Sequence, residues 1–324
     1  MQVHEQYPEI YHYTTPAGLS GIIDSQALRA SHARYLNDSS ELQVFFDQRL
    51  PELITSEVRN GLRVLESVPA IAERVREFGG FEKAVADTSN GIVFSIRQAT
   101  LRFNETYVLS FCTAADDWTT SNGLLSQWRA YGKDGGYAIA FDTKQLKQRL
   151  SKEWSSFHYQ HGLIDVVHYH GGPPPTTAVP EVISESEQVL RTSVFSFLKP
   201  DSLAALEPVH GAATTLSCLY KHGGFREERE VRIVAIPAHT EIVAEAHKTS
   251  VKAPPEKPRA HYIRNGCPVP CIQLFGGSEP LPISRVIVGP NPDQDLRVKA
   301  VELMLRSKDI RATVVPSTIP LGGG

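Results

Sequence analysis

Residues 9–16, which read EIYHYTTP, contain the pattern that decides the fold. The stretch 9–14 is short and rich in aromatic residues, which is typical of a β-strand. Successive side chains of a strand alternate between its two faces, so His12 should share one face with Ile10 and Thr14. The two tyrosines should share the other. The Thr-Pro pair that follows supplies an N-cap and a first helical residue, which predicts a helix directly after the strand.

Further strands are expected along the chain, each recognised by a short run of β-branched or aromatic residues. A helical turn over 124–131 should separate the first two of them. The end of the chain has a β-α-β pattern. The expected strands cover 107–112, 137–141, about 163–169, 230–235, 285–289 and 311–315, with a helix over 295–307.

Helical periodicity predicts two insertions between these strands, at about 51–86 and 181–206. Asp38 and Glu41 have the spacing of a helix capping box. The proline-containing segment 246–259 is expected to form an exposed loop or linker. Without repeats or a clear boundary, the sequence predicts one α+β domain over 1–324, a mixed sheet with helical insertions and a C-terminal βαβ element.

Composition limits the classes of protein to which the chain can belong. It has 33 basic and 36 acidic residues, a formal net charge of −3, and 41% apolar residues. This balance is typical of a globular protein and excludes a uniformly basic nucleic-acid-binding chain, although it allows a local basic groove. No apolar run reaches the roughly 20 residues that span a bilayer, and no signal peptide is visible. We therefore expect a cytoplasmic protein with no membrane partner.

Several common catalytic and metal-binding patterns are missing from the sequence. There is no dinucleotide-binding glycine motif, P-loop, nucleophile elbow or zinc-protease motif. The close pair Cys267 and Cys271 has no second pair to complete a zinc site, so reduced thiols are expected. The histidines between His158 and His170 lack a carboxylate pattern, and we expect no metal there.

Three separate places contain side chains suited to chemistry. The first is His12 on the first strand, and the second is the segment 127–131, which leads into a glycine turn. The third is the acidic approach to the strand at 230, where Glu228, Glu230 and Arg232 should point to one side of the strand. Two carboxylates on one face raise each other's proton affinity and need a cation, which Arg232 can supply. Taken singly, each feature also fits a core or surface role.

At these places the sequence resembles the bacterial family known as domain of unknown function 2971. The resemblance covers almost the whole chain, and its specificity lies in the order of many weak landmarks. These are Tyr11 to Thr14, Leu36 to Asp38 with Glu41, Trp128 with Tyr131, the glycine turn before 138–141, Val167 with Tyr169, Phe225 to Arg232, Val288 to Pro290 and Ser317 to Pro320.

That family is in turn distantly similar to ADP-ribosyltransferases. The similarity implies an ADP-ribosyltransferase-like fold, with split mixed β-sheets around a cleft that binds NAD as a substrate. In such folds a histidine lies on the first strand, an aromatic residue on a central strand or helix, and a glutamate on a late strand. This chain departs from the pattern in two ways, because His12 and Tyr131 are far apart in sequence and Tyr131 precedes the glycine turn.

The resemblance implies a role for each matching residue. His12 would bind the nicotinamide-side ribose, with Tyr13 and Thr14 beside it, and Tyr131 or Tyr137 would stack on the nicotinamide. Glu230 would stabilise the positive charge that develops as nicotinamide leaves, and Glu228 would polarise the acceptor. The remaining two positions are Arg232, which would hold the carboxylates or meet a phosphate, and Asn37, which would lie at the mouth of the cleft with Asp38.

The function implied is an NAD-dependent ADP-ribosyltransferase that modifies RNA, DNA or protein, as a bacterial toxin or phage-defence effector controlled by an antidote or regulator protein. Three alternatives stay open. One is an NAD glycohydrolase, in which water is the acceptor. Another is a transferase of RNA 2′-phosphate, for which Arg29, Arg34, Arg129 and Arg232 are candidate ligands. The third is a non-catalytic binding or sensor module on the same fold.

Overall fold

The computed structural model describes residues 2–36, 41–103, 105–131, 136–171, 179–197, 206–249, 252–277 and 279–320. The chain forms two compact units. Unit 1 comprises residues 1–32, 107–167 and 225–324, and unit 2 comprises residues 33–106 and 168–224. The α+β class expected from the sequence is confirmed, whereas one domain over 1–324 stays a prediction. Among the described residues, no helix is both long and apolar enough to span a membrane.

Unit 1 is built on a ten-stranded mixed sheet. Eight strands follow the order β12-β11-β4-β1-β3-β2-β10-β9, and β8 pairs with β3 on one edge and β5 on the other. Neighbours are antiparallel except for the parallel pair β11 and β12. The strands are β1 (Glu9–Thr14), β2 (Ala27–His32), β3 (Tyr107–Cys112), β4 (Tyr137–Asp142), β5 (Tyr159–Val166), β8 (Glu230–Pro237), β9 (Arg259–Arg264), β10 (Cys267–Phe275), β11 (Ile283–Val288) and β12 (Thr313–Pro316).

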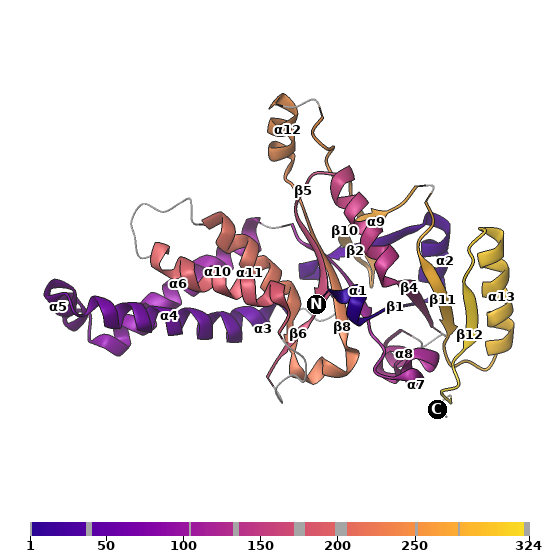
Figure 1. Cartoon of the computed structure of the whole chain (residues 1–324), viewed down its shortest axis with the longest axis horizontal. Coiled ribbons are helices and arrows are strands. Elements are labelled where there is room, and N and C mark those ends of the chain that lie inside the picture. The colour runs from indigo at the N-terminus through magenta and orange to yellow at the C-terminus, as the bar shows by residue number, and fades with distance from the viewer. Residues whose placement is uncertain are drawn as a thin grey trace. The chain divides into compact units, whose positions relative to one another are not determined.

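The sheet branches at β3. One edge of β3 pairs with β8 along its whole length. The other edge is shared, because β1 meets it at the single pair Tyr11 and Cys112, and β2 meets it at Ser31 and His32. Two groups of strands therefore diverge from the middle of β3, one containing β1, β4, β11 and β12 and the other containing β2, β10 and β9 (Figure 1). We call the point of divergence the fork.

The two faces of the sheet differ in what covers them. The His12 face carries Ile10, Phe111 and Ile139, which belong to the main apolar core of unit 1. The Glu230 face carries Tyr11 and Tyr13 together with Cys112 and the small side chains of β4, and here a second core forms around Trp128. The alternation predicted for β1 from the sequence is thus confirmed.

Helices of unit 1 cover both faces. As predicted, Thr15 caps α2 by accepting a hydrogen bond from the Gly18 N–H at 3.2 Å, and Pro16 opens that helix. Helices α7 and α8 lie next to each other below β4 in Figure 1, whereas α13 flanks β12 at the edge of the sheet. The helices are α1 (Val3–Gln6), α2 (Pro16–Ser25), α7 (Asp117–Asn122), α8 (Leu125–Tyr131), α9 (Thr143–Ser156), α12 (Thr240–Thr249) and α13 (Gln294–Ser307), with a 3₁₀ helix, η4 (Gly223–Glu228), that ends just before β8.

Unit 2 is mainly helical and contains both helical blocks expected from the sequence. The carboxylate of Glu187 accepts two hydrogen bonds from Arg49, each 2.7 Å long, so α10 is bound to the segment that precedes α4. The helices are α3 (Glu41–Val44), the π-helical turn η2 (Phe45–Arg49), α4 (Leu50–Leu65), α5 (Pro69–Glu77), α6 (Phe81–Phe103), α10 (Glu181–Phe197) and α11 (Leu206–Leu219). Two short parallel strands, β6 (His168–His170) and β7 (Tyr220–His222), and a 3₁₀ turn, η1 (Ala33–Tyr35), complete the unit.

Two sequence predictions about the elements were wrong. The strand expected over 163–169 is two strands in different sheets, because β5 pairs with β8 and β6 pairs with β7. The segment 246–259 is not an exposed linker, since α12 continues to Thr249 and Lys257 is buried. The capping box proposed at Asp38 lies outside the described residues.

Candidate functional site

His12 occupies the fork of the sheet. Its Nδ1 lies 3.0 Å from the backbone oxygen of Ser110 on β3, and its ring meets Phe111 edge-on at 5.8 Å between ring centroids. In a continuous antiparallel ladder the Ser110 carbonyl would pair with a backbone N–H of β1. Here the strands have diverged after Tyr11, and the imidazole satisfies that carbonyl instead. The side chain therefore lies in the gap between the two strands.

The protonation of His12 follows from this geometry. A carbonyl oxygen only accepts hydrogen bonds, so Nδ1 must carry the proton. Burial lowers the pKa of His12, although the bond to Ser110 opposes the shift. At neutral pH the ring is therefore neutral, and Nε2 has a lone pair that can accept a hydrogen bond. A ribose hydroxyl is a donor suited to that nitrogen.

Glu230 and Arg232 form a buried ion pair at the start of β8. Arg232 Nε donates to Glu230 Oε1 at 2.7 Å, and its Nη2 donates to Oε2 at 3.0 Å. Both side chains are nearly inaccessible, with 4% and 1% exposure respectively. A bidentate guanidinium contact fixes the plane of the carboxylate and sets a positive charge beside it in a site of low polarity. The Glu230 carboxylate is therefore held in a fixed orientation on β8, which is separated from β1 by β3.

Glu228 is not on the strand, contrary to the sequence prediction. It ends the 3₁₀ helix η4, and the next residue, Arg229, has a left-handed backbone with φ of 46°. Thr113 holds this turn, because its N–H donates to the Arg229 carbonyl at 3.0 Å. The turn breaks the period-two alternation, so only Glu230 and Arg232 share a face of β8. Glu228 is half-buried just before the strand.

A second polar cluster lies on the Glu230 face beside β1. The Tyr11 hydroxyl donates to Glu9 Oε2 at 3.0 Å and accepts from Arg285 Nη2 at 3.0 Å. Arg285 also donates to Glu9 at 2.6 Å. Burial, followed by the Glu9 charge, raises the pKa of Tyr11 to about 12. Tyr11 lies within the stretch 9–16, but its partner Arg285 is on β11, which is far away in the sequence. The cluster was therefore not predicted from the sequence.

The register aligns this cluster with Glu230. Arg285 pairs with Ala140, and Ala140 pairs with Tyr11. Tyr11 pairs with Cys112, which pairs with Glu230. Paired residues in adjacent strands lie on the same face. One row across five strands therefore runs from Arg285 to Glu230, with the fork in its middle.

The aromatic candidates fall on opposite faces. Tyr131 ends α8 and packs against the Trp128 core on the Glu230 face. Tyr13 lies on the same face, where its ring meets Trp128 edge-on at 5.0 Å and its hydroxyl accepts from the Leu124 N–H at 2.7 Å. Tyr137 pairs with Thr14 and belongs to the core of the His12 face. Of the two candidates for stacking on nicotinamide, Tyr131 is thus the one that shares a face with Glu230.

The structure therefore brings together one part of the predicted set and separates the other. Tyr13, Tyr131, Glu230 and Arg232 lie on one face of the sheet, whereas Thr14 and Tyr137 lie on the other. His12 belongs to the second face by alternation, but its ring enters the gap at the fork. Asn37 lies outside the described residues.

Other landmarks have structural explanations. A Cβ at Gly289 would lie 2.9 Å from the Trp128 ring, so a glycine is needed where β11 ends. The Thr318 N–H and hydroxyl both donate to Asn122 Oδ1 at 2.7 Å, and Ser317 donates to the Asn122 carbonyl at 2.8 Å. These contacts fasten the C-terminal segment to α7. No group of three or more metal-ligating side chains was found among the described residues.

Comparison with known proteins gives one match, to a family of unknown function, over part of the chain. Residues 127–233 match the family described as protein of unknown function DUF2971. The matching segment includes Tyr131, Glu228, Glu230 and Arg232. No curated protein and no solved structure gives a significant match to the chain.

Proposed function

We propose that the chain, which matches the DUF2971 family over residues 127–233, is an NAD-dependent ADP-ribosyltransferase. The observation that supports this best is the fork, where β1 and β3 share only the pair Tyr11 and Cys112 before they diverge. A cleft between two small sheets, with a histidine on its first strand and a glutamate on a late strand, is what the resemblance implies. His12 lies in the gap itself, and Glu230 lies on the strand that backs it.

His12 would fix the ribose next to nicotinamide. Its Nδ1 proton is donated to the Ser110 carbonyl, so Nε2 is the ring nitrogen that can accept a hydrogen bond from a hydroxyl. A neutral imidazole in a buried gap has little freedom to rotate. In the proposed complex it therefore accepts a hydrogen bond from the ribose and sets the pose of the glycosidic bond.

Glu230 would act on the developing charge. The bond between ribose C1′ and nicotinamide breaks with its electron pair leaving on nicotinamide, so positive charge develops at C1′ and the ring oxygen. A fixed carboxylate directed at this charge stabilises the transition state without reorganisation. Arg232 orients the carboxylate and acts as a positioning residue. The acceptor nucleophile then adds to C1′ and releases its proton, which Glu228 would receive.

The acceptor class is RNA, DNA or protein, and the biological setting that we propose is a bacterial toxin or phage-defence effector held in check by a regulator protein. Tyr131 is the proposed stacking partner of nicotinamide, since it shares a face with Glu230. Both assignments depend on the family resemblance.

Measurement of free nicotinamide tests the proposal. The protein is incubated with NAD alone and then with RNA, DNA or cell lysate. Glu230→Gln should abolish release, and the matched control Glu227→Gln, which alters an exposed carboxylate three residues earlier, should release nicotinamide at the wild-type rate. Release by the Glu230 variant at that rate removes Glu230 from the mechanism. Release with NAD alone identifies a glycohydrolase activity.

One observation favours a non-catalytic alternative. Both carboxylate oxygens of Glu230 already accept a hydrogen bond from Arg232. A binding or sensor module on the same fold would keep such a pair for its structure alone. For that module, calorimetry would show NAD binding without release under any condition, or no NAD binding at all.

A further inference from the structure

Strands β2, β10 and β9 form a part of the sheet with an unusual charge. Between them they contain no aspartate or glutamate, but three arginines, Arg29, Arg259 and Arg264. The whole chain has a net charge of −3, so these three strands are more positive than the chain as a whole. Arg259 is engaged by Glu256 and by the carbonyl of Ala238. Arg29, in contrast, has an exposed side chain in the middle of β2.

Arg29 is held in a defined pose by Tyr262 on β9. Its guanidinium lies over the Tyr262 ring, 4.6 Å from the centroid. The Tyr262 hydroxyl is in turn 3.0 Å from the hydroxyl of Ser31, which ties β9 to β2. A guanidinium stacked in this way keeps its in-plane N–H donors available for a phosphate, and its outer plane can stack on a base.

The register places this group on a functional face. Arg29 alternates with Leu28 and Ala30, which belong to the main core on the His12 face. Ser31, two residues along, pairs with Val108, which alternates along β3 to Cys112, the partner of Glu230. Arg29, Ser31 and Tyr262 therefore lie on the Glu230 face, in the strands that diverge at the fork opposite β1.

We propose that the face formed by Arg29, Ser31, Tyr262 and Gln273 binds single-stranded nucleic acid. Single strands are bound by positive charge along the backbone combined with flat side chains on which bases stack. Arg29 and Arg264, which share this face, supply the charge, whereas Arg259 pairs with Ile272 on the His12 face. The Arg29–Tyr262 pair supplies the flat surface. Gln273, which is exposed and pairs with Arg29 across the strands, adds donors and acceptors for a base edge.

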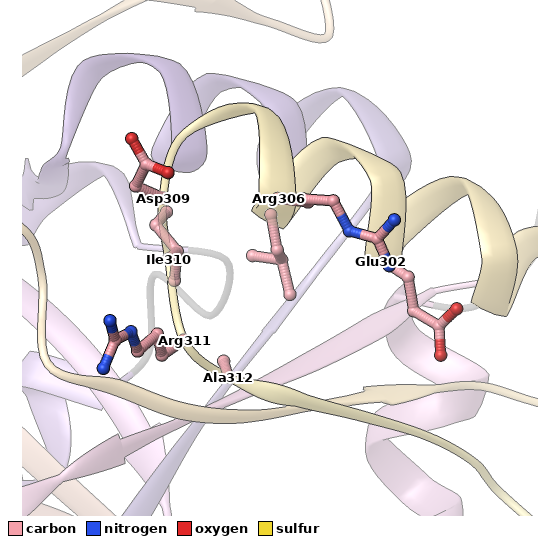
Figure 2. Close-up of a pocket in the computed structure, with 7 residues that line it drawn as sticks. Glu302, Arg306, Asp309, Ile310, Arg311 and Ala312 are labelled. Atoms are coloured by element: carbon pink, nitrogen blue, oxygen red, sulfur yellow. The ribbon is translucent and has the colours of Figure 1, made fainter.

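Another exposed arginine site in unit 1 lacks this combination. The hollow at the end of α13, with a volume of about 540 Å³, is lined by Arg306 and Arg311 but also by Glu302 and Asp309 (Figure 2). Its two carboxylates offset the two guanidinium groups. Arg306 is exposed and therefore provides a matched control, since its replacement removes the same charge at a site not expected to bind an anion.

The test is binding of a fluorescently labelled 20-nucleotide RNA or DNA single strand to the full chain, without NAD, followed by anisotropy over a range of salt concentrations. Wild-type protein should bind, with affinity falling as salt rises. Arg29→Gln should weaken binding about tenfold and reduce the slope against log salt by about 0.7, the share of one phosphate contact. Tyr262→Leu should also weaken binding about tenfold by removing the stacking surface. Arg306→Gln should bind like wild type.

Four outcomes would overturn the proposal. The first is absence of binding at low salt, and the second is an equal loss of affinity in Arg306→Gln. The third is displacement of the strand by polyglutamate of equal charge, which would assign the face to acidic proteins. The fourth is a loss of NAD affinity in Arg29→Gln without any loss of strand binding. The last would assign Arg29 to the phosphates of NAD. Because strand binding is measured without NAD, its failure is separable from failure of the transferase proposal.

Discussion

Unit 1 contains two buried carboxylate–cation pairs that look alike, and we assign them different roles. Glu153 on α9 contacts Lys257 at 2.5 Å, and both side chains are 4% exposed. The same carboxylate accepts hydrogen bonds from the Tyr159 hydroxyl at 2.7 Å and the Phe275 N–H at 3.0 Å. One glutamate thus joins a helix, two strands and the segment before β9. Its partners are far apart in sequence, as expected of a group that stabilises tertiary structure.

The pair of Glu230 and Arg232 has a different arrangement. The two residues are two positions apart on one strand, so this ion pair lies within β8. Desolvating two charges costs several kcal/mol, and an ion pair inside one strand does not by itself join separate elements. The comparison shows that burial and pairing alone do not separate structural from functional charges, so we assign roles by the elements that each ion pair joins. This is the reason for assigning chemistry to Glu230 and not to Glu153.

The largest effect is expected on stability, from the Glu153 pair. Lys257→Met should lower the free energy of unfolding by about 3–5 kcal/mol, because it leaves Glu153 buried without its counter-charge. Urea denaturation measures this directly. Lys248→Met, which removes an exposed lysine paired with Glu245, should cost no more than about 1 kcal/mol. Equal costs would contradict the structural role given to Lys257.

The second effect is expected on catalysis. Glu230→Gln should lower nicotinamide release about 100-fold or more, the scale of losing one electrostatic contact to a transition state. Its stability cost should be about 1–3 kcal/mol, since the amide oxygen still accepts from Arg232. Glu153→Gln should show the reverse pattern, a lower melting temperature with kcat retained. A Glu230 variant that is unstable but fully active would reverse our assignment of the two pairs.

The sequence predicted the features that depend on residues close together in the chain, and it missed those that depend on residues far apart. Strand β1, its alternation and the helix after it follow from neighbouring residues, and all were predicted within 9–16. The turn at Arg229 was not, because its left-handed backbone depends on Thr113, which follows β3 and is far away in the sequence. Lys257 was expected in an exposed segment because three prolines surround it. Its partner Glu153 is about a hundred residues away, so no local pattern indicated burial.

The candidate site shows the same limit. The residue types at His12, Glu230 and Arg232 were visible in the sequence, and the pairing of the last two followed from period two. The fork was not visible, since it depends on two strands that share one edge of β3. Strands β2, β9 and β10 were missed because alanine, arginine and proline weaken the strand pattern. The face around Arg29 was therefore invisible until the register was known.

A third, smaller effect is expected on NAD binding. His12→Ala removes the Nε2 acceptor and should weaken NAD affinity about tenfold, which corresponds to one hydrogen bond of about 1.4 kcal/mol. Calorimetry with NAD in the Glu230→Gln background measures affinity without turnover. Tyr137→Phe, which changes a buried hydroxyl on the His12 face, is the matched control and should bind NAD unchanged. Wild-type affinity in the alanine variant would make His12 a purely structural residue of the fork.

The smallest effect concerns pH, and it separates the structural from the functional part of His12. Burial depresses the pKa of His12 below the 6.5 of an unfolded chain. The unfolded chain therefore takes up the proton first as pH falls, so the stability due to the neutral ring is complete above pH 6.5 and is lost as pH falls through the folded pKa.

His12→Gln can keep a donor to Ser110 but cannot titrate, so its stability should fall less steeply below pH 6.5 than that of wild type. His161 and His210, whose pKa values burial also lowers, remain in both proteins and cancel in the difference. Parallel pH profiles in urea denaturation would mean that His12 takes up its proton as readily in the fork as in the unfolded chain, which would contradict the burial assigned to its ring.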